Sequence, residues 1–396
     1  MAVSKTFDAI VIGAGPAGSL VAARLAGLGH SVAMLDGRPA TSIGPCCTGV
    51  VGEPYLDLTG LEADAVCAEE RSAMFFSPSG YRLHVESSET QAYVLDRSLL
   101  EERLRERAVS AGAERVARMT ALGASRQSNG LWSVRCVCQG GRQYLESRSV
   151  VLAHGSAPGL TRSVGLKGPR RFMVGAHVEL EMNDVHETEV YFLQDLSRGM
   201  FAWLVPLGNS RVRGGVLSTH SASRLMTEFL YRPEMRSRLK GGVGTISQRP
   251  VPLAVASHMC DDGIMLVGDS AGQVKPTTGG GLYLGAVAAD IASATLDEAL
   301  RDDDLSARRL AGYEREWRRR FGSEVRRAAV ARRIYDSLSP SRVDRMISWA
   351  ASSGIADELL QSGSFSFDLH GRTLLTGIVR ALLGSVMGSR RSEESA

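Results

Sequence analysis

The stretch 8–36 constrains the fold of this chain more than any other part of the sequence. An apolar run is followed by the glycine pattern Gly13-x-Gly15-x-x-Gly18, a helix-like segment and a second apolar run that ends on Asp36. This order predicts a strand, a tight turn, a helix and a second strand. The sequence therefore begins with the first unit of a doubly wound α/β sheet.

Each glycine of this pattern has a distinct expected role. Gly13 allows the tight turn, Gly15 lets backbone amides approach a pyrophosphate at the helix N-terminus, and Gly18 lets the helix close on the sheet. The carboxylate of Asp36 can accept hydrogen bonds from ribose hydroxyls. The alternative is a glycine-rich turn in an ordinary α/β domain. The residues assigned here to a dinucleotide site are Gly13, Gly15, Ala17, Gly18, Asp36 and Gly37.

Composition narrows the class of protein. With 396 residues, 44% of them apolar, the chain can form two or three globular domains. The 46 basic and 43 acidic residues nearly cancel, which is not the balance of a nucleic-acid-binding protein. The six cysteines lack metal-site spacing and are expected to be free thiols, so no metal is predicted. No signal peptide or membrane span is visible, so we expect a cytoplasmic protein.

Two later elements carry further nucleotide-binding signals. Arg97 stands at the start of an amphipathic helix, 98–111, where its guanidinium either pairs with phosphate or ribose oxygens or serves as a solvated or intrahelical arginine. A buried strand ends in Gly268-Asp269, and a glycine run, 279–281, then precedes a long helix. Such glycines place a helix N-terminus and bare backbone against a flat or anionic ligand.

A change of pattern separates the domains. Four short strand-like runs between residues 172 and 217 predict an antiparallel sheet. The predicted organisation is a discontinuous first domain, an antiparallel-sheet substrate domain, a helical C-terminal region and a disordered tail; the respective ranges are 1–165 with 253–305, 166–252, 306–388 and 389–396.

The C-terminal region has two unusual segments. Residues 308–333 contain a dense run of arginines interleaved with aromatic and aliphatic residues, and Leu374–Met387 is a second amphipathic segment that is too short to span a bilayer. The arginine run is either the solvated face of a docked helix or a helix that lies on an anionic membrane surface.

Together, the early glycine pattern, Arg97 and Gly268-Asp269 resemble the FAD-binding proteins of the p-hydroxybenzoate hydroxylase fold group. Within that group, Gly279-Gly280-Gly281 and the loop around Cys47 look like the geranylgeranyl reductase family. The resemblance covers residues 5–300. It implies an α/β fold with a Rossmann-like FAD-binding domain, and it adds Gly268, Asp269, Gly279, Gly280 and Gly281 to the cofactor-binding residues.

The resemblance also assigns substrate-binding residues. In that family an aromatic-x-Trp-x-Phe-Pro motif lines the isoprenoid cavity, and Phe201, Trp203 and Pro206 stand at the matching positions here. Phe201 replaces a typical tyrosine, and Val205 replaces a phenylalanine. The alternative is that Phe201 and Trp203 are core aromatics of a central strand.

Cys47 matches the family's cysteine, with Cys46 beside it. A thiol that faces the flavin could relay a proton to the substrate or gate the cavity, and the alternative is a buried structural thiol. His154 replaces the aspartate of an Asp-Gly motif through which the hydroxylases often handle the pyridine nucleotide.

The resemblance implies an FAD-dependent reductase that saturates C=C bonds of a polyprenyl chain carried on a lipid, quinone or tetrapyrrole precursor. The electron donor is either NAD(P)H or a small redox protein, the oligomeric state is open, and peripheral membrane contact is expected because the substrate is nearly insoluble. The rival interpretations are a flavin-dependent monooxygenase or halogenase, and a non-catalytic or redox-sensing flavoprotein.

Overall fold

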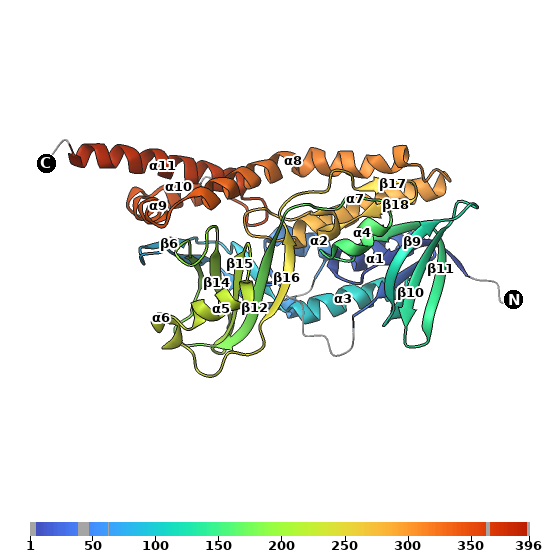
Figure 1. Ribbon diagram of the computed structural model, residues 1–396, viewed down its shortest axis with the longest axis horizontal. Helices are drawn as coiled ribbons and strands as arrows, with labels where there is room; N and C mark the ends of the chain where they lie inside the picture. The colour runs from blue at the N-terminus through green and yellow to red at the C-terminus, as the bar shows by residue number, and fades with distance from the viewer. Residues whose placement is uncertain (1–4, 39–46, 62, 362–364, 394–396) are drawn as a thin grey trace.

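The computed structural model describes residues 5–38, 47–61, 63–361 and 365–393, so Cys46 lies outside the described residues. Figure 1 shows three parts: a parallel sheet with a hairpin beside it, an antiparallel sheet, and long C-terminal helices that run along one edge of both.

The parallel sheet is built around the first strand of the chain. Its order is β17-β18-β11-β1-β2-β8, with β9 and β10 extending from β11 as an antiparallel hairpin. Because β11, β1, β2 and β18 are parallel, their carboxyl ends meet at one edge, where doubly wound sheets bind ligands. The strands of this sheet are β1 (Thr6–Ile12), β2 (Val32–Asp36), β8 (Glu114–Ala117), β9 (Thr120–Arg126), β10 (Trp132–Cys138), β11 (Gly141–Leu152), β17 (Cys260–Asp261) and β18 (Ile264–Leu266).

The antiparallel sheet contains the four predicted runs but is larger than the range 166–252. Two strands from the first part of the chain join it, because β5 pairs in parallel with β13 and carries β6. Its order is β16-β12-β15-β14-β13-β5-β6. Its strands are β5 (Ser72–Phe76), β6 (Arg82–Glu86), β12 (Phe172–Glu181), β13 (Thr188–Phe192), β14 (Phe201–Gly208), β15 (Arg211–Ser218) and β16 (Ser247–Pro252).

A small third sheet lies between these two and carries the loop after Cys47. Its strands are β3 (Val50–Val51), β4 (Val66–Glu70) and β7 (Ala92–Leu95). The helices outside the C-terminal region are α1 (Pro16–Gly27), α2 (Glu53–Thr59), α3 (Arg97–Ser110), α4 (Pro158–Ser163), α5 (Ala222–Leu230), α6 (Pro233–Arg236) and α7 (Leu282–Arg301), with short 3-10 turns η1 (Ala63–Ala65) and η2 (Gly268–Ala271).

The C-terminal region is helical, as predicted. It consists of α8 (Ala307–Ser337), α9 (Pro340–Ser353), α10 (Ile355–Gln361) and α11 (Gly371–Glu393). Helix α11 extends through residues 389–393, which we expected to be disordered; arginine and glutamate are good helix formers, and they continue the helix here. Residues 394–396 lie outside the described part of the chain.

The arginine run forms the polar face of a docked helix. Leu310, Tyr313, Trp317 and Phe321 of α8 are buried in the same core as β1 and α7. Arg332 is an exception to the solvated face, because it is 3% exposed and its guanidinium reaches the Gly199 carbonyl oxygen. This arginine joins α8 to the antiparallel sheet.

Within the described residues, no helix combines the length and apolar character that crossing a bilayer requires. The five cysteines in this part of the chain are free thiols.

Candidate functional site

The glycine turn has the geometry that the sequence pattern predicts. Gly13 has a φ of +113°, and a Cβ added to Gly18 would lie 1.9 Å from the Gly13 carbonyl oxygen. Both positions therefore require glycine. Gly15 differs, because a Cβ there would meet no atom within 4 Å. Gly15 is also the N-cap of α1 and gives it no side-chain cap, which leaves amides at a positive helix end for an anionic ligand.

A cluster of buried charges lies beside this turn. Arg97 is 5% exposed, and its Nη2 donates to Glu101 over 2.7 Å. Its Nε and Nη1 are buried and have no hydrogen-bond partner among the residues that the structure describes. Glu101 also binds Arg38 and Arg105, and Arg105 donates to the Ala14 carbonyl oxygen of the glycine turn over 3.4 Å. Two unpaired guanidinium donors next to the turn fit the oxygens of a pyrophosphate or ribose.

Asp36 already binds two arginines in this structure. Its Oδ1 accepts from Arg38 Nε and its Oδ2 from Arg115 Nη2, both over 3.1 Å. Burial acts to raise the pKa of Asp36, but these arginines hold it below its usual value. A carboxylate has about four lone-pair sites. Ribose hydroxyls would therefore bind Asp36 either beside Arg38 or in its place. At Gly37, a Cβ would lie 2.9 Å from Thr120 Oγ1, so a larger residue at this position would collide with Thr120.

The second nucleotide element meets the first at Ala17. Gly268 has a φ of +75°, and a Cβ added there would lie 3.0 Å from the Ala17 Cβ. The Asp269 carboxylate lies 3.5 Å from Arg249, and a Cβ at Gly281 would lie 2.9 Å from Asp269 Oδ1. Two segments about 250 residues apart thus share one edge of the sheet. This convergence fits one extended dinucleotide such as FAD, as the resemblance implied.

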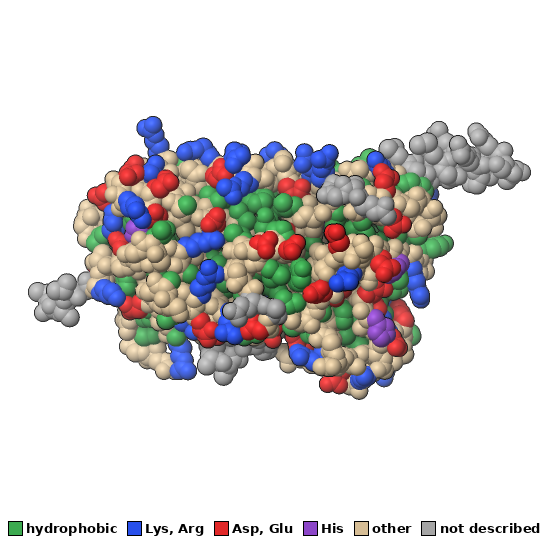
Figure 2. All heavy atoms as spheres, turned by 180° about the vertical axis from the view of Figure 1, so that it is seen from behind, with side chains coloured by type: hydrophobic (Ala, Val, Ile, Leu, Met, Phe, Trp, Pro, Cys, Tyr) green, Lys and Arg blue, Asp and Glu red, His purple; other side chains and the backbone are tan. Residues whose placement is uncertain are grey.

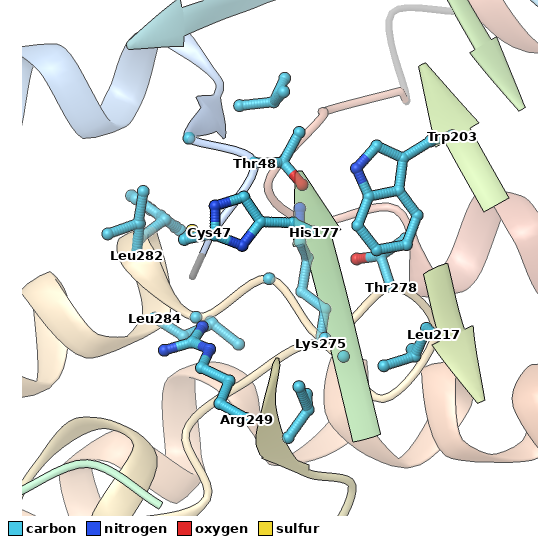
Figure 3. A pocket seen from close by; sticks show the side chains of 18 of the residues that line it. Cys47, Thr48, His177, Trp203, Leu217, Arg249, Lys275, Thr278, Leu282 and Leu284 are labelled. Carbon is cyan, nitrogen blue, oxygen red and sulfur yellow. The ribbon is translucent and has the colours of Figure 1, made fainter. Parts of the chain in front are cut away.

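A cavity of about 710 Å³, partly open to solvent, lies between the glycine run 279–281 and the antiparallel sheet. Cys47, His177 from β12, Trp203 from β14 and Lys275 all line it (Figure 3). Most of the remaining wall is apolar or backbone; it includes Val50, Gly175, Leu217, Val251, Leu282, Tyr283 and Leu284. A partly open cavity with a mainly apolar wall and a few polar side chains is typical of a small-molecule site.

The loop that carries Cys47 is held in place from three sides. Arg213, 5% exposed, donates to the Thr48 carbonyl oxygen over 2.7 Å. Gly49 accepts from the Leu95 amide over 2.9 Å, and the Gly52 amide donates to the Asp368 carboxylate over 3.0 Å. Cys47 is therefore anchored next to the cavity by the substrate sheet and by the C-terminal region.

The structure separates the three predicted substrate residues. Trp203 lines the cavity, and its indole lies so close to Gly215 that a Cβ there would lie 2.2 Å from the ring. Phe201 is the neighbour of Trp203, with ring centroids 5.5 Å apart, and it also packs against the C-terminal helices. Pro206 pairs with Val212 further along β14 and is not part of the cavity wall.

Several polar residues of the cavity wall were not predicted as site residues, among them His177, Lys275 and Asp368. Burial and the charges of Arg213 and Arg249 lower the pKa of His177 to about 4. Burial lowers the pKa of Lys275 to about 8, against the opposing effect of Asp368. His177 and Lys275 each interrupt an otherwise apolar or glycine-rich stretch, and that interruption was the available signal. Nothing in the local sequence of Asp368 places it at this site.

His154 lies beside the dinucleotide turn, since a Cβ at Gly13 would approach its Cα to 3.0 Å. Its Nε2 shares a hydrogen bond with Thr161 Oγ1 over 2.9 Å, and burial lowers its pKa to about 4. It is therefore a neutral side chain at physiological pH. Among the described residues, no group of three or more His, Cys, Asp or Glu side chains could hold a metal ion.

Comparisons with known proteins agree with this geometry. Residues 8–348 match the sequence model of the family described as lycopene cyclase protein. The chain belongs to this family. A relative, digeranylgeranylglycerophospholipid reductase 2 of Methanothermobacter thermautotrophicus, is 29% identical over 86% of this chain and 91% of its own length.

Solved structures confirm the predicted fold of this lycopene cyclase family member. A geranylgeranyl bacteriochlorophyll reductase-like protein of Thermoplasma acidophilum superposes with a TM-score of 0.84 at 22% identity, over 98% of this chain and 99% of that one. The halogenase PltM in complex with FAD superposes with a TM-score of 0.68 at 14% identity, over 94% and 85%. The resemblance to geranylgeranyl reductases is confirmed, and the fold is that of FAD-binding oxidoreductases.

Proposed function

We propose that this protein is an FAD-dependent reductase that saturates C=C bonds in the polyprenyl chains of a glycerophospholipid. One observation carries the proposal: a single cavity brings together the glycine run 279–281, Cys47 and Trp203. The relative from M. thermautotrophicus, which matches most of this chain, is named for reduction of a digeranylgeranyl phospholipid.

The chain's own residues bind, orient and dehydrate the reactants. The open side of Gly15, the unpaired donors of Arg97 and the Gly268-Asp269 turn would hold FAD, which when bound supplies a hydride. The glycine run leaves bare backbone beside the cavity, where a flat ring can approach. Trp203, Leu217 and Val251 offer an apolar wall that places an alkene against this run and excludes water.

The electron donor is proposed to be NAD(P)H or a small redox protein. The functional test works with either donor, because dithionite takes its place. Protein loaded with FAD is reduced anaerobically with dithionite and mixed with a digeranylgeranyl glycerophospholipid in detergent. The expected product gains two hydrogens per reduced bond, detected by mass spectrometry, while the flavin is reoxidised without oxygen. Oxygen-dependent hydroxylation or halogenation would instead show a monooxygenase or halogenase. A flavin that no alkene reoxidises would favour the redox-sensing interpretation.

We expect Cys47→Ser to lower alkene reduction by about 100-fold or more while FAD stays bound. The reason is that Cys47 lines the cavity and is proposed to deliver a proton there, and such general-acid steps contribute roughly 10²–10⁴-fold. Cys67→Ser is the matched control, because Cys67 is an exposed thiol. Equal loss of flavin and activity in Cys47→Ser would show a structural thiol instead.

We also propose that the C-terminal region contacts the membrane from which the lipid is taken. Arg326, Arg327 and Arg333 are exposed on α8 and form no ion pair within the described residues. Leu374 and Val379 of α11 are 38% and 41% exposed. Seen from behind in Figure 2, basic side chains gather along the upper edge of the molecule, above an apolar area.

Replacing these three arginines with serine should release the protein from anionic vesicles. Each basic residue near an anionic surface contributes about 1 kcal/mol to binding. The affinity for anionic vesicles should therefore fall on the order of 100-fold at low salt, and the difference from wild type should shrink as salt rises. Flotation with phosphatidylglycerol and phosphatidylcholine vesicles measures it. A control variant removes the same charge through Arg142→Ser, Arg224→Ser and Arg236→Ser, which are exposed elsewhere. Equal flotation of wild type and both variants would contradict the contact.

Truncation is a poor substitute for these variants, because Asp368 and His370 belong to the wall around Lys275 and Thr277. A chain that ends before residue 365 would lose part of the site as well as α11.

A further inference from the structure

Lys275 and Asp368 form a partition between two cavities. Both residues, together with Leu284, line the reaction cavity, and the same three residues line a second, much smaller cavity that has room for about one water molecule. Lys275 is 8% exposed and Asp368 3%. Lysine and aspartate are rarely buried unless they are paired, so a buried pair in a wall between two cavities calls for a functional explanation.

The ammonium of Lys275 is well held but not fixed in a tight ion pair. Its Nζ donates to the Phe367 carbonyl oxygen over 2.8 Å and lies 4.3 Å from the Phe367 ring centroid. The nearest Asp368 carboxylate oxygen is 3.9 Å away, and the other oxygen of Asp368 accepts from the Gly52 amide. Since an ammonium has three donors, hydrogens remain that can be passed on.

The second cavity extends from this pair to the middle of α8. Its polar lining includes Glu324, which is half-buried and accepts from the Gly371 amide, and His370, which shares a hydrogen bond with Thr277 over 3.0 Å. The charged and titratable groups that face Lys275 or its neighbours are Asp368, Glu324, His370, Tyr283, Tyr55 and, through the Thr277 carbonyl, Arg332. Polar groups thus lie on both sides of the partition.

We propose that Lys275 is the proton supplier of the reaction cavity, restoring the proton that Cys47 gives to the alkene and refilling from solvent through the second cavity. This inference rests on the proposed reductase function. It assigns to Lys275 and Asp368 a role that neither the sequence pattern nor the family comparison gives them.

The proton balance is complete in three transfers. The S–H bond of Cys47 breaks, and its proton forms the C–H bond at the alkene carbon that does not receive the flavin hydride, leaving a thiolate. An N–H bond of the Lys275 ammonium then breaks, the proton goes to the thiolate, and the electron pair stays on Nζ as a neutral amine. Water that enters through the second cavity reprotonates the amine and returns hydroxide to solvent.

Burial favours this exchange. It lowers the pKa of Lys275 to about 8, well below the ordinary lysine value of about 10.4, so the ammonium gives up a proton more readily than an exposed lysine does. Burial also lowers the pKa of His370 to about 3, so His370 stays neutral and does not compete as a cation. The Asp368 carboxylate acts to raise the pKa of Lys275, which keeps the ammonium form present at pH 7.

The first test is kinetic and uses FAD-loaded protein with excess dithionite and the digeranylgeranyl lipid. Lys275→Met should give a first reduction near the wild-type rate, because Cys47 is already protonated, and later reductions slowed about 100-fold. Lys275→Arg keeps the charge but cannot release a proton at neutral pH, so it should behave like Lys275→Met. Lys240→Met, an exposed lysine, is the control.

The pH dependence has a defined sign. The supplier works as the ammonium, so steady-state turnover of wild type should fall as the pH rises through about 8, at the midpoint of the Lys275 titration described below. In both Lys275 variants the fall should no longer lie at that midpoint. Variants with unslowed later turnovers, or with an unchanged upper pH limb, would overturn the proposal. If wild type does not reduce the lipid at all, the proposed function fails and the titration below still tests Lys275.

The second test needs no activity. Lys5, Lys167, Lys240 and Lys275 are the four lysines of the chain, so selective carbon-13 labelling at Cε gives four signals, and Lys275→Arg identifies its own. The Lys275 signal should titrate near pH 8, and Asp368→Asn should move its midpoint lower, because a neighbouring negative charge is lost. A midpoint near the ordinary lysine value of about 10.4 would overturn the role of Lys275.

Discussion

Replacing Gly18 with alanine should abolish FAD retention. The added Cβ would lie 1.9 Å from the Gly13 carbonyl oxygen, directly after β1, and 3.1 Å from the Ala153 Cβ, directly after β11. Backbone cannot move aside like a flexible side chain, so α1 must shift away from β1. Overpacking typically lowers the free energy of unfolding by about 1–3 kcal/mol. Because this contact is with backbone, we expect a loss in the upper part of that range.

The measurement is the flavin content of purified protein together with its free energy of unfolding. Gly27→Ala is the matched control, because it is in the same helix and its Cβ would meet no atom within 4 Å. That variant should retain FAD and stay within about 1 kcal/mol of wild type. A Gly18→Ala protein with normal flavin content would contradict the close packing of α1 on the sheet.

Arg97→Met should weaken FAD binding by on the order of 100-fold. Two guanidinium nitrogens of Arg97 are buried and have no partner in the described part of the chain, and hydrogen bonds to charged groups contribute about 1.5–3 kcal/mol each. The apoprotein should keep its stability within about 1 kcal/mol, because Glu101 retains Arg38 and Arg105 as partners and the buried unpaired donors disappear.

Titration of apoprotein with FAD, followed by flavin fluorescence, gives the dissociation constant, and thermal unfolding with and without FAD gives the stability. Arg103→Met controls for the loss of one arginine from α3, since Arg103 is largely exposed and pairs with Asp64 over 2.7 Å. If Arg97→Met destabilised the apoprotein as much as the FAD complex, Arg97 would be an intrahelical structural residue, the other role that its sequence position allows.

The parts of the fold that are local in sequence could be predicted from it. The strand, turn and helix around Gly13 follow from hydrophobic period and glycine spacing, and β1, α1 and β2 lie where expected. The docked face of α8 follows equally from the spacing of Leu310, Tyr313 and Trp317.

The parts that depend on distant pairing could not be predicted. No local pattern predicts that β5 pairs with β13, more than a hundred residues later, so the sequence alone does not assign β5 and β6 to the antiparallel sheet. The contact between Lys275 and Asp368 also joins residues that are far apart in the sequence, so no local pattern predicts it. At Asp36, the sequence identified the acid but not the arginines that bind it, because Arg115 reaches it only through the pairing of β2 with β8.

The partition at Asp368 has a consequence for how the protein is made in the cell. At about 5–20 residues per second, this aspartate is synthesised roughly 20–70 s after the turn at Gly18. The Gly52 amide has no Asp368 to bind until then, so the segment with the nucleotide-binding turn is synthesised well before the cavity can close. We therefore expect FAD to be able to enter while the cavity is still open, and the contact between Asp368 and Gly52 to close the cavity afterwards.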